Sequence, residues 1–380
     1  MNTAIHIAET PAEREAIYKL RYQIYVEEMH IFGSVANHDE QLFIEETDAH
    51  ARLIYATVNG EIVGSLRLNL GVDAPFSEEF EETYNLHLFR DNVSDDQLMV
   101  LTRFMVKEEY RGSAIAFRMI AEAGKVAIQH NIQVAVCDCQ PHLIRYYNRM
   151  GFRSYACDIY NDPEFGIMIP LALVLPDQGY LKAIRSPLKS MLTPLADQSL
   201  GDALAACLGA PRVDTLGDRP SQGDEGVLET LLRRHENAEV AFFEGLSAVE
   251  VESLVRSGYI INCQPGDRVI RKGQLTNTVF VLLAGELHIE DAQGRTVARA
   301  HVGDVVGEMA YLLGARRSAD VLAGSEGARL LILDERQLNR ELSPASPTAP
   351  TLFKNLSRTL ADKLARMLMN IEGAQVAGAV

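Results

Sequence analysis

Apolar residues in the first part of the chain recur first with a helical period and then with the period of strands. The stretch from Thr10 opens with Thr-Pro-Ala-Glu, a capping-box pattern with proline at the first helical position, and helical spacing continues to about residue 29. Two apolar runs, 51–58 and 61–68, flank an Asn-Gly pair, which is typical of tight hairpin turns. We therefore predict a helix followed by a β-hairpin.

Strands and helices then alternate. The patterns predict strands over 98–106, 133–137 and 166–175, separated by helices over 110–129 and 143–149. A hairpin followed by strand, helix, strand, helix and strand predicts an α+β fold, a mixed sheet with helices packed on it. We predict that this first domain covers residues 1–176.

The pattern changes in the rest of the chain. Residues 177–239 contain short helical pieces interrupted by prolines and by a stretch rich in Gly, Pro, Asp and Ser, which predicts a helical connector. Residues 240–370 show short β-runs separated by glycine turns, which is typical of an all-β jelly roll with flanking helices. This second domain ends in a leucine-rich helix over 351–369, and residues 371–380 form a tail.

Composition and charge exclude several classes of partner. The chain has 380 residues, a formal charge of −16 and no basic stripe, so a nucleic-acid-binding surface is not expected. No apolar run approaches the about 20 residues that span a bilayer, and residues 1–10 lack the pattern of a signal peptide. Five cysteines, an odd number, do not suit a disulfide framework. We predict a soluble cytoplasmic protein.

Two other features are interpreted as carrying no chemistry. The Cys-Asp-Cys string at 137–139 lacks a second pair of ligands, so no metal site is predicted. The acidic run at 78–82 is interpreted as a solvated surface.

The chemistry of the second domain is concentrated in 306–319, Val-Gly-Glu-Met-Ala-Tyr-Leu-Leu-Gly-Ala-Arg-Arg-Ser-Ala. A short helix that begins after a glycine presents free backbone N–H groups, which suit an anionic phosphate. Arg317 can add a charge-assisted hydrogen bond to the phosphate oxygens, and Glu308 can accept one from a ribose hydroxyl.

This segment resembles the phosphate-binding cassette of the cyclic-nucleotide-binding superfamily, and the resemblance extends over about 242–366. It implies that a cyclic nucleotide lies on Gly307, Glu308, Met309, Ala310, Arg317, Ser318 and Ala319. The Arg-Ser-Ala string is similar to that of the bacterial cAMP-binding members, so cAMP rather than cGMP is expected. The family usually has proline at Arg316. The alternative is a degenerate barrel in which Glu308 and Arg317 only pair with each other.

In the first domain, the string Tyr-Arg-Gly-Ser-Ala-Ile-Ala at 110–116 lies directly between a predicted strand and a predicted helix. Outward-pointing amides at a helix N-terminus, with Arg111 beside them, would bind a pyrophosphate. Together with Phe-Met-Val at 104–106 and Tyr-Tyr-Asn-Arg-Met-Gly-Phe at 146–152, this string resembles the GNAT acyltransferase superfamily over about 5–175.

The GNAT resemblance implies an acyl-coenzyme A donor, or an acyl carrier protein in its place. The coenzyme pyrophosphate would lie on Arg111, Gly112, Ser113, Ala114, Ile115 and Ala116, and the pantetheine arm on the backbone of Phe104 and Val106. Tyr147 would protonate the leaving thiolate. The family normally has glycine at Ala114.

The helical segment 19–28 and the Thr-Arg-Phe string at 102–104 resemble one GNAT branch, the acyl-homoserine-lactone and N-acyl-amino-acid synthases. The resemblance implies that the acceptor and acyl pocket is shaped by Arg21, Asp48, Arg67 and Arg103. The catalytic glutamate of that branch falls at Val100 here. By position, the candidate bases are Asp138 and His142, with Glu28 and His50 further off.

The preferred hypothesis is a cAMP-regulated N-acyltransferase that moves an acyl group from acyl-CoA or acyl carrier protein to a small-molecule amine. A cAMP-regulated protein lysine acetyltransferase is one alternative. A non-catalytic cyclic-nucleotide sensor, whose first domain only binds coenzyme or a partner, is another. The leucine-rich terminal helix is a candidate contact for a homodimer.

Overall fold

The computed structural model of the chain describes residues 3–162, 164–209, 213–215, 240–274, 276–291, 293–333 and 335–377. Its contacts divide the chain into two units, one formed by 1–160 with 168–211 and the other by 161–167 with 212–380. Much of the predicted connector, 210–212 and 216–239, lies outside the described residues, as do the last three residues of the predicted tail.

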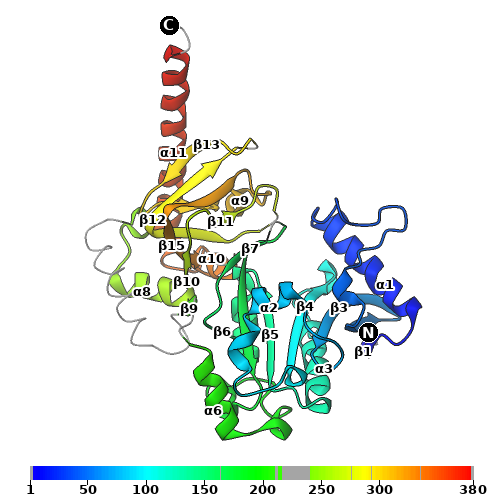
Figure 1. Ribbon diagram of the computed structural model, residues 1–380. Coiled ribbons are helices and arrows are strands. Elements are labelled where there is room, and N and C mark those ends of the chain that lie inside the picture. The colour runs from blue at the N-terminus through cyan, green and yellow to red at the C-terminus, as the bar shows by residue number, and fades with distance from the viewer. Residues whose placement is uncertain are drawn as a thin grey trace. The chain divides into compact units, whose positions relative to one another are not determined.

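A mixed sheet forms the centre of the first unit (Figure 1). Among the described residues it has eight strands, β1 (Thr3–Ile7), β2 (Arg52–Val58), β3 (Glu61–Leu70), β4 (Leu98–Val106), β5 (Val134–Cys139), β6 (Arg153–Ser154), β7 (Tyr160–Asp162) and β8 (Gly166–Val174). Their order is β1-β2-β3-β4-β5-β8-β6, with β7 paired to β8, and β4 and β5 run parallel. The predicted α+β architecture is confirmed, while β1, β6 and β7 are strands that the pattern did not predict.

The helices of the first unit are α1 (Pro11–Tyr22), α2 (Glu78–Tyr84), α3 (Ile115–Gln129), α4 (Ile144–Met150), α5 (Gln178–Ala183) and α6 (Gln198–Cys207). The predicted capping box is present, because the Thr10 hydroxyl accepts from the Glu13 N–H and the Glu13 carboxylate accepts from the Thr10 N–H. Helix α1 continues into a π-helix, η1 (Gln23–Glu28). Short 3₁₀ helices are η2 (Glu46–Asp48), η3 (Leu86–Phe89), η4 (Asp95–Gln97), η5 (Glu108–Tyr110), η6 (Pro141–Leu143) and η7 (Thr193–Leu195).

The predicted hairpin between β2 and β3 turns at Asn59 and Gly60. Their φ angles are 50° and 89°. A two-residue turn with positive φ at both positions matches the twist of the strands that it joins, and it strongly favours Asn-Gly. This part of the fold therefore follows directly from two residues of the sequence.

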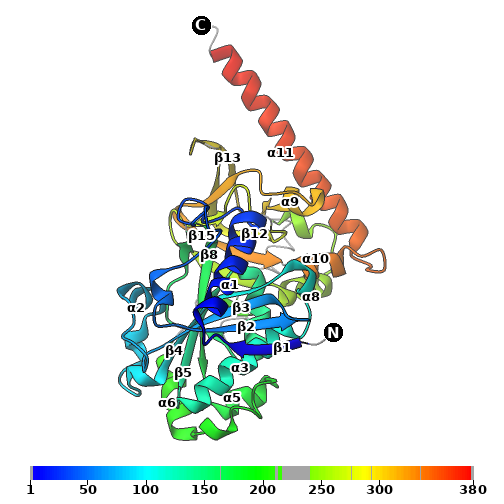
Figure 2. The same cartoon turned by 90° about the vertical axis from the view of Figure 1, so that its right-hand side faces the viewer.

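Helices cover both faces of the sheet, with α1 and α3 on the two sides of β2 and β3 (Figure 2). Ile17 of α1 packs with Leu53 and Tyr55 of β2. On the other face, a Cβ at Gly64 would come within 2.9 Å of the Met119 methyl group of α3. Further along the sheet, Val100 is fully buried in a cluster with residues of α2 and α6.

The second unit is built on an antiparallel sheet, which has seven strands among the described residues. They are β9 (Val213–Thr215), β10 (Tyr259–Cys263), β11 (Arg268–Ile270), β12 (Val279–Glu290), β13 (Thr296–Ala300), β14 (Val305–Val306) and β15 (Asp320–Leu333). The helices are η8 (Ala241–Phe243), α8 (Ala248–Ser257), α9 (Glu308–Leu313), α10 (Glu335–Glu341) and α11 (Ala349–Ala377). Helix α11, red in Figure 1, buries Leu352 and Leu356 in the core of this unit, beside Phe242 and Phe243.

Candidate active site and nucleotide pocket

The parallel strands β4 and β5 separate halfway along β4. Their ladder ends at Leu101 and Cys137, although β4 continues for five more residues to Val106. Just beyond the last pair, Arg103 has a left-handed φ of 52°, and the register against β3 shifts. This irregularity is a β-bulge, which bends a strand and interrupts its pairing. Phe104, which is predicted to bind the pantetheine arm, lies on this part of β4, beyond the last β5 partner.

The predicted pyrophosphate loop joins β4 to α3. Its residues Arg111, Gly112, Ser113, Ala114, Ile115 and Ala116 lie at the N-terminus of α3, where the first backbone N–H groups have no helical acceptor. Gly112 has a φ of 79°, which would strain any side chain. Ala114 has right-handed backbone angles, φ −72° and ψ −4°. Alanine therefore fits the backbone at the position where the GNAT family has glycine.

Arg111 is engaged by a carboxylate. Its Nε donates to the Val106 carbonyl at 3.0 Å, and its Nη2 donates to Glu28 at the end of η1. Glu28, one of the more distant candidate bases, thus lies at the pyrophosphate loop. A bound pyrophosphate would compete with Glu28 for this guanidinium.

Tyr147 is buried in α4 among aromatic rings. Its ring centroid lies 6.5 Å from that of Phe104 and 5.6 Å from that of Phe152. Burial raises the pKa of Tyr147 well above its usual range, so the phenol stays protonated at neutral pH. That is the state which a proton donor to a thiolate requires.

The two candidate bases lie near the end of β5. Asp138 is half-buried and accepts a hydrogen bond from the Tyr160 hydroxyl, and its charge contributes to the raised pKa of Tyr147. His142 is exposed in η6. Cys137 and Cys139 are both buried thiols, and within the described residues no group of three metal-ligating side chains could hold a metal ion.

The four predicted pocket residues are joined by a fifth, Glu45. Arg21 donates to both oxygens of Asp48 at 2.9 and 2.8 Å, and both side chains are almost completely buried. Arg67 lies 2.9 Å from Glu45 and 3.5 Å from Asp48. Arg103 holds Glu45 through two hydrogen bonds. The result is a continuous network from α1 to the bulge of β4.

Glu45 has no sequence signal of its own, because it precedes a 3₁₀ helix in a polar loop. Burial alone would raise its pKa, but the hydrogen bonds and charge of Arg103, followed by the charge of Arg67, hold the pKa of Glu45 below its usual range. The Arg103 guanidinium is also placed over the rings of Tyr25, Phe32 and Phe43, at 5.6, 5.0 and 5.6 Å. These contacts fix the direction of Arg103 beside the bulge.

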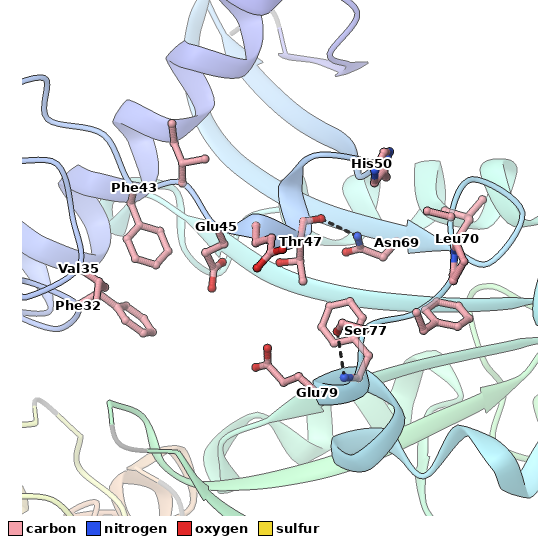
Figure 3. A pocket seen from close by; sticks show the side chains of 16 residues that line it. Phe32, Val35, Phe43, Glu45, Thr47, His50, Asn69, Leu70, Ser77 and Glu79 are labelled. Atoms are coloured by element: carbon pink, nitrogen blue, oxygen red, sulfur yellow. Dashed lines mark hydrogen bonds between the residues drawn. The ribbon is translucent and has the colours of Figure 1, made fainter.

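A pocket of about 570 Å³ opens beside this network (Figure 3). Its walls come from the segments around residues 32–35 and 43–50, from the end of β3, and from 74–80 at the start of α2. The polar side chains on these walls are Glu45, Glu46, Thr47, His50, Asn69, Ser77 and Glu79. The acidic run at 78–82, interpreted above as a solvated surface, therefore contributes Glu79 to a pocket.

Arg317 lies buried in the second unit, and no carboxylate of the described residues forms an ion pair with it, although the charge of Glu308 acts on it from a distance. It is 4% exposed, and it donates to the Thr276 hydroxyl at 3.1 Å and to the Gly307 and Thr278 carbonyls at 2.8 and 2.5 Å. Burial lowers its pKa to about 10. A buried guanidinium whose contacts are neutral oxygens fits an anionic ligand.

Glu308 pairs with α11 instead of Arg317. Its buried carboxylate accepts from the Lys363 Nζ at 2.7 Å, and this ammonium also donates to the Val305 carbonyl at 2.5 Å. The alternative in which Glu308 and Arg317 neutralise each other is therefore not the arrangement observed.

The rest of the cassette surrounds these two groups. Gly307 has a φ of 90° at the start of α9, and a Cβ there would come within 2.5 Å of Arg317. Arg316 donates to the Gly273 carbonyl at 2.9 Å, which ties the turn where the family has proline. The other predicted contacts are Met309 (exposed), Ala310 (buried), Ser318 (exposed) and Ala319 (half-buried).

No helix of the described residues is long and apolar enough to cross a membrane.

Two family models match the chain. That of the N-acyl amino acid synthase FeeM matches residues 16–168, and that of the cyclic nucleotide-binding domain matches residues 260–343. Among solved structures, a CoA-dependent acyl-homoserine lactone synthase, BjaI, is similar at 16% identity and a TM-score of 0.39, covering 49% of this chain and 91% of that one. A cyclic nucleotide-binding domain from Methylobacillus flagellatus KT is similar at 21% identity and a TM-score of 0.36, covering 43% and 89%.

Curated relatives match over a limited part of their length. The Pycsar effector protein XpPycTIR of Xanthomonas perforans is 31% identical over 144 residues, 38% of this chain and 45% of that protein. Isozyme 1 of the cGMP-dependent protein kinase of Drosophila melanogaster is 31% identical over 137 residues, 33% and 18% of the two chains. The chain thus spans less than half the length of each of these relatives.

Proposed function

We propose that this chain, which joins a GNAT-like domain of the FeeM and acyl-homoserine-lactone synthase type to a cyclic nucleotide-binding domain, is an N-acyltransferase regulated by cAMP. The donor is an acyl thioester of coenzyme A or acyl carrier protein, and the acceptor is an amine. One observation supports this proposal most. Strands β4 and β5 separate beyond Leu101, and three features gather at this gap. They are the bulged end of β4, the loop with Gly112 that follows it, and the buried Tyr147.

In this proposal each group has a defined task. The amides of the loop from Arg111 to Ala116 bind the donor pyrophosphate, and the backbone of Phe104 and Val106 binds the pantetheine arm. The acceptor amine gives up a proton to Asp138 or to water and attacks the thioester carbonyl carbon. A C–N bond forms, the C–S bond breaks, and Tyr147 protonates the leaving thiolate.

Thiol release measured against a set of acyl-CoA donors and amines tests the enzymatic part. We expect thiol release that depends on the amine, with an amide product of matching mass. Acylation of lysine side chains on added protein, in place of small amines, would favour the protein lysine acetyltransferase alternative.

A non-catalytic sensor is supported by one observation, because Val100 is buried where the lactone-synthase branch has its catalytic glutamate. The two functions differ in a direct way. Binding of acyl-CoA without amine-dependent thiol release, with and without nucleotide, would identify the sensor.

Regulation rests on Arg317 and Glu308. We expect cAMP to bind with its phosphate on Arg317 and its ribose on Glu308, and cGMP to bind more weakly. Isothermal titration of the wild type and of Arg317→Glu measures this directly. Saturable binding that the variant loses supports the regulatory domain, and no binding of either nucleotide to the wild type contradicts it.

A further inference from the structure

The pocket beside the arginine network is lined by both aromatic rings and carboxylates. Four phenylalanines, Phe32, Phe43, Phe76 and Phe80, supply aromatic surface. Three carboxylates, Glu45, Glu46 and Glu79, lie on the same walls, whereas no lysine or arginine of the described part of the chain does. Aromatic faces and carboxylates together favour an organic cation over a neutral or anionic ligand.

The three carboxylates are not equivalent. Glu45 is held by Arg67 and Arg103, so its charge is largely compensated. Glu46 and Glu79 are exposed and form no ion pair among the described residues. They come from different walls, the start of η2 and the first turn of α2, and Figure 3 shows Glu45 and Glu79 directed toward the same open space. Two uncompensated negative charges therefore border the pocket.

Asn69 adds a buried acceptor to the same wall. Its Nδ2 donates to the Thr47 carbonyl at 2.8 Å, which fixes the orientation of the amide. The Oδ1 atom is consequently an acceptor, and it is buried without a hydrogen-bond donor among the described residues. Because almost none of its surface is exposed, a ligand in the open pocket does not contact it, and the polar contacts open to a ligand on these walls are mainly carboxylates.

We propose that the acceptor substrate is an aliphatic diamine or polyamine, an amine that keeps a second positive charge in this pocket. The inference rests on the proposed N-acyltransferase function. One nitrogen, neutral after losing its proton, attacks the thioester carbonyl, so that a C–N bond forms and the C–S bond breaks, and the thiolate takes up a proton. The other nitrogen stays an ammonium group bordered by Glu46 and Glu79.

An amino acid acceptor would place a carboxylate in the same pocket. Arg21, Arg67 and Arg103 outnumber Asp48 and Glu45 by one, but these guanidinium groups lie behind the two carboxylates and not on the pocket wall. The amino acid would have to displace Glu45 from Arg103 while facing Glu46 and Glu79. The pocket therefore discriminates against it.

The test compares acceptors and variants in the full chain with cAMP present. The acceptors are 1,4-diaminobutane, butylamine, glycine and tyrosine, each with the same acyl-CoA, and the products are identified by mass spectrometry. Titration of 1,4-diaminobutane without donor gives a binding readout that is independent of turnover. The variants are Glu46→Gln, Glu79→Gln and the double variant.

We expect the KM for the diamine to rise about threefold in each single variant and about tenfold in the double variant, because each loses one partly exposed charge pair. The kcat should not change, and butylamine should be insensitive to the substitutions. Glu78→Gln is the matched control, because it removes a carboxylate from the same first turn of α2 but not from the pocket wall.

The other outcomes separate the two proposals. Acylation of glycine or tyrosine in preference to the diamine would overturn the diamine inference and leave the N-acyltransferase function intact. Diamine binding that the double variant loses, without acylation of any acceptor, would support the pocket chemistry and overturn the proposed function. No diamine binding to the wild type would overturn the inference.

Discussion

Tyr146 and Tyr147 are adjacent in α4, and both rings lie near Phe104, at centroid distances of 6.3 and 6.5 Å. Burial raises the pKa of Tyr146 to about 12 and that of Tyr147 well above its usual range. Both phenols are therefore protonated at neutral pH, so protonation state alone does not distinguish them. The GNAT resemblance implies that Tyr147 protonates the leaving thiolate. The Tyr146 hydroxyl, by contrast, is buried without a hydrogen-bond partner among the described residues.

Replacing each tyrosine by phenylalanine separates their tasks. Tyr147→Phe should lower kcat by a factor on the order of 10², the usual contribution of a positioned proton donor, while acyl-CoA binding is retained. Tyr146→Phe removes an unsatisfied buried hydroxyl, so we expect wild-type kcat and an unchanged or higher Tm. Steady-state kinetics and thermal denaturation measure both. A large loss of kcat in Tyr146→Phe but not in Tyr147→Phe would mean that Tyr146, and not Tyr147, is the proton donor.

At the scale of an element, Lys363 links helix α11 to the nucleotide cassette and to the strand β14 beside it. Lys363 donates to Glu308 and to the Val305 carbonyl, and Glu308 is the group expected to hold the ribose. The ammonium and a ribose hydroxyl would therefore compete for one carboxylate. Nucleotide binding is therefore expected to weaken the ion pair between Glu308 of the cassette and Lys363 of α11.

Lys363→Met tests this competition. Without the ammonium, Glu308 is available to the ribose, and cAMP should bind roughly tenfold more tightly, as expected when one charge-assisted hydrogen bond no longer competes. Lys354→Met is the matched control, because Lys354 lies exposed on the same helix. Titration calorimetry gives both affinities. Weaker binding in Lys363→Met would instead mean that Lys363 contacts the bound nucleotide.

Helix α1, which carries Arg21 into the network, has a carboxylate with a strongly lowered pKa, that of Glu13, in its first turn. Hydrogen bonds from Tyr55 and then Thr10 lower the pKa of Glu13 from 4.5 to about 2. A lowered pKa in the folded state contributes stability above the unfolded value of 4.5, and this contribution is lost as the pH falls toward 2.

The corresponding variant is Glu13→Gln, which keeps the shape of the side chain and removes its charge. Its Tm should lie below that of the wild type at pH 7, and the difference should shrink between pH 4.5 and pH 2. Tyr55→Phe, which removes the largest cause of the shift, should show the same trend with a smaller amplitude. A difference in Tm that is independent of pH would contradict the assignment.

At the scale of the whole molecule, the chain consists of two units with separate cores and separate candidate ligands. Ligand binding stabilises the unit that it contacts, by about 2.7 kcal/mol at a hundredfold excess over Kd. Regulation requires in addition that one ligand changes the affinity for the other, and such coupling is reciprocal.

Differential scanning calorimetry of the full chain measures both effects. We expect cAMP to raise the unfolding temperature of the second unit and acyl-CoA that of the first. Under regulation, saturating cAMP should also change the Kd for acyl-CoA, and saturating acyl-CoA should change the Kd for cAMP by the same factor. Two independent shifts without any change in either Kd would leave two ligand sites without regulation.

Much of the fold could be predicted because its signals are local. In three places the backbone conformation requires particular residue types within one to four adjacent positions. These are the capping box at Thr10, the Asn59-Gly60 turn and the glycine of the pyrophosphate loop. Strand β1 was missed because it is five residues long and only partly buried, so its pairing with β2 defines it more than its apolar pattern does. The acidic first turn of α2 is exposed, as the sequence predicts, but the pocket beside Glu79 could not be predicted because it forms from distant segments.

By itself the sequence determined the fold classes of the two parts of the chain, because short motifs specify turns, caps and helix starts, and it supplied candidate site residues that stay predictions. Only the tertiary structure decided which of these groups meet. Glu45 joins Arg103 across 58 residues, Glu28 reaches Arg111 across 83, and Lys363 reaches Glu308 across 55. The physical reason is that the packing of the whole chain decides which distant charges come together, and a buried charge such as Glu308 needs a partner where packing places it.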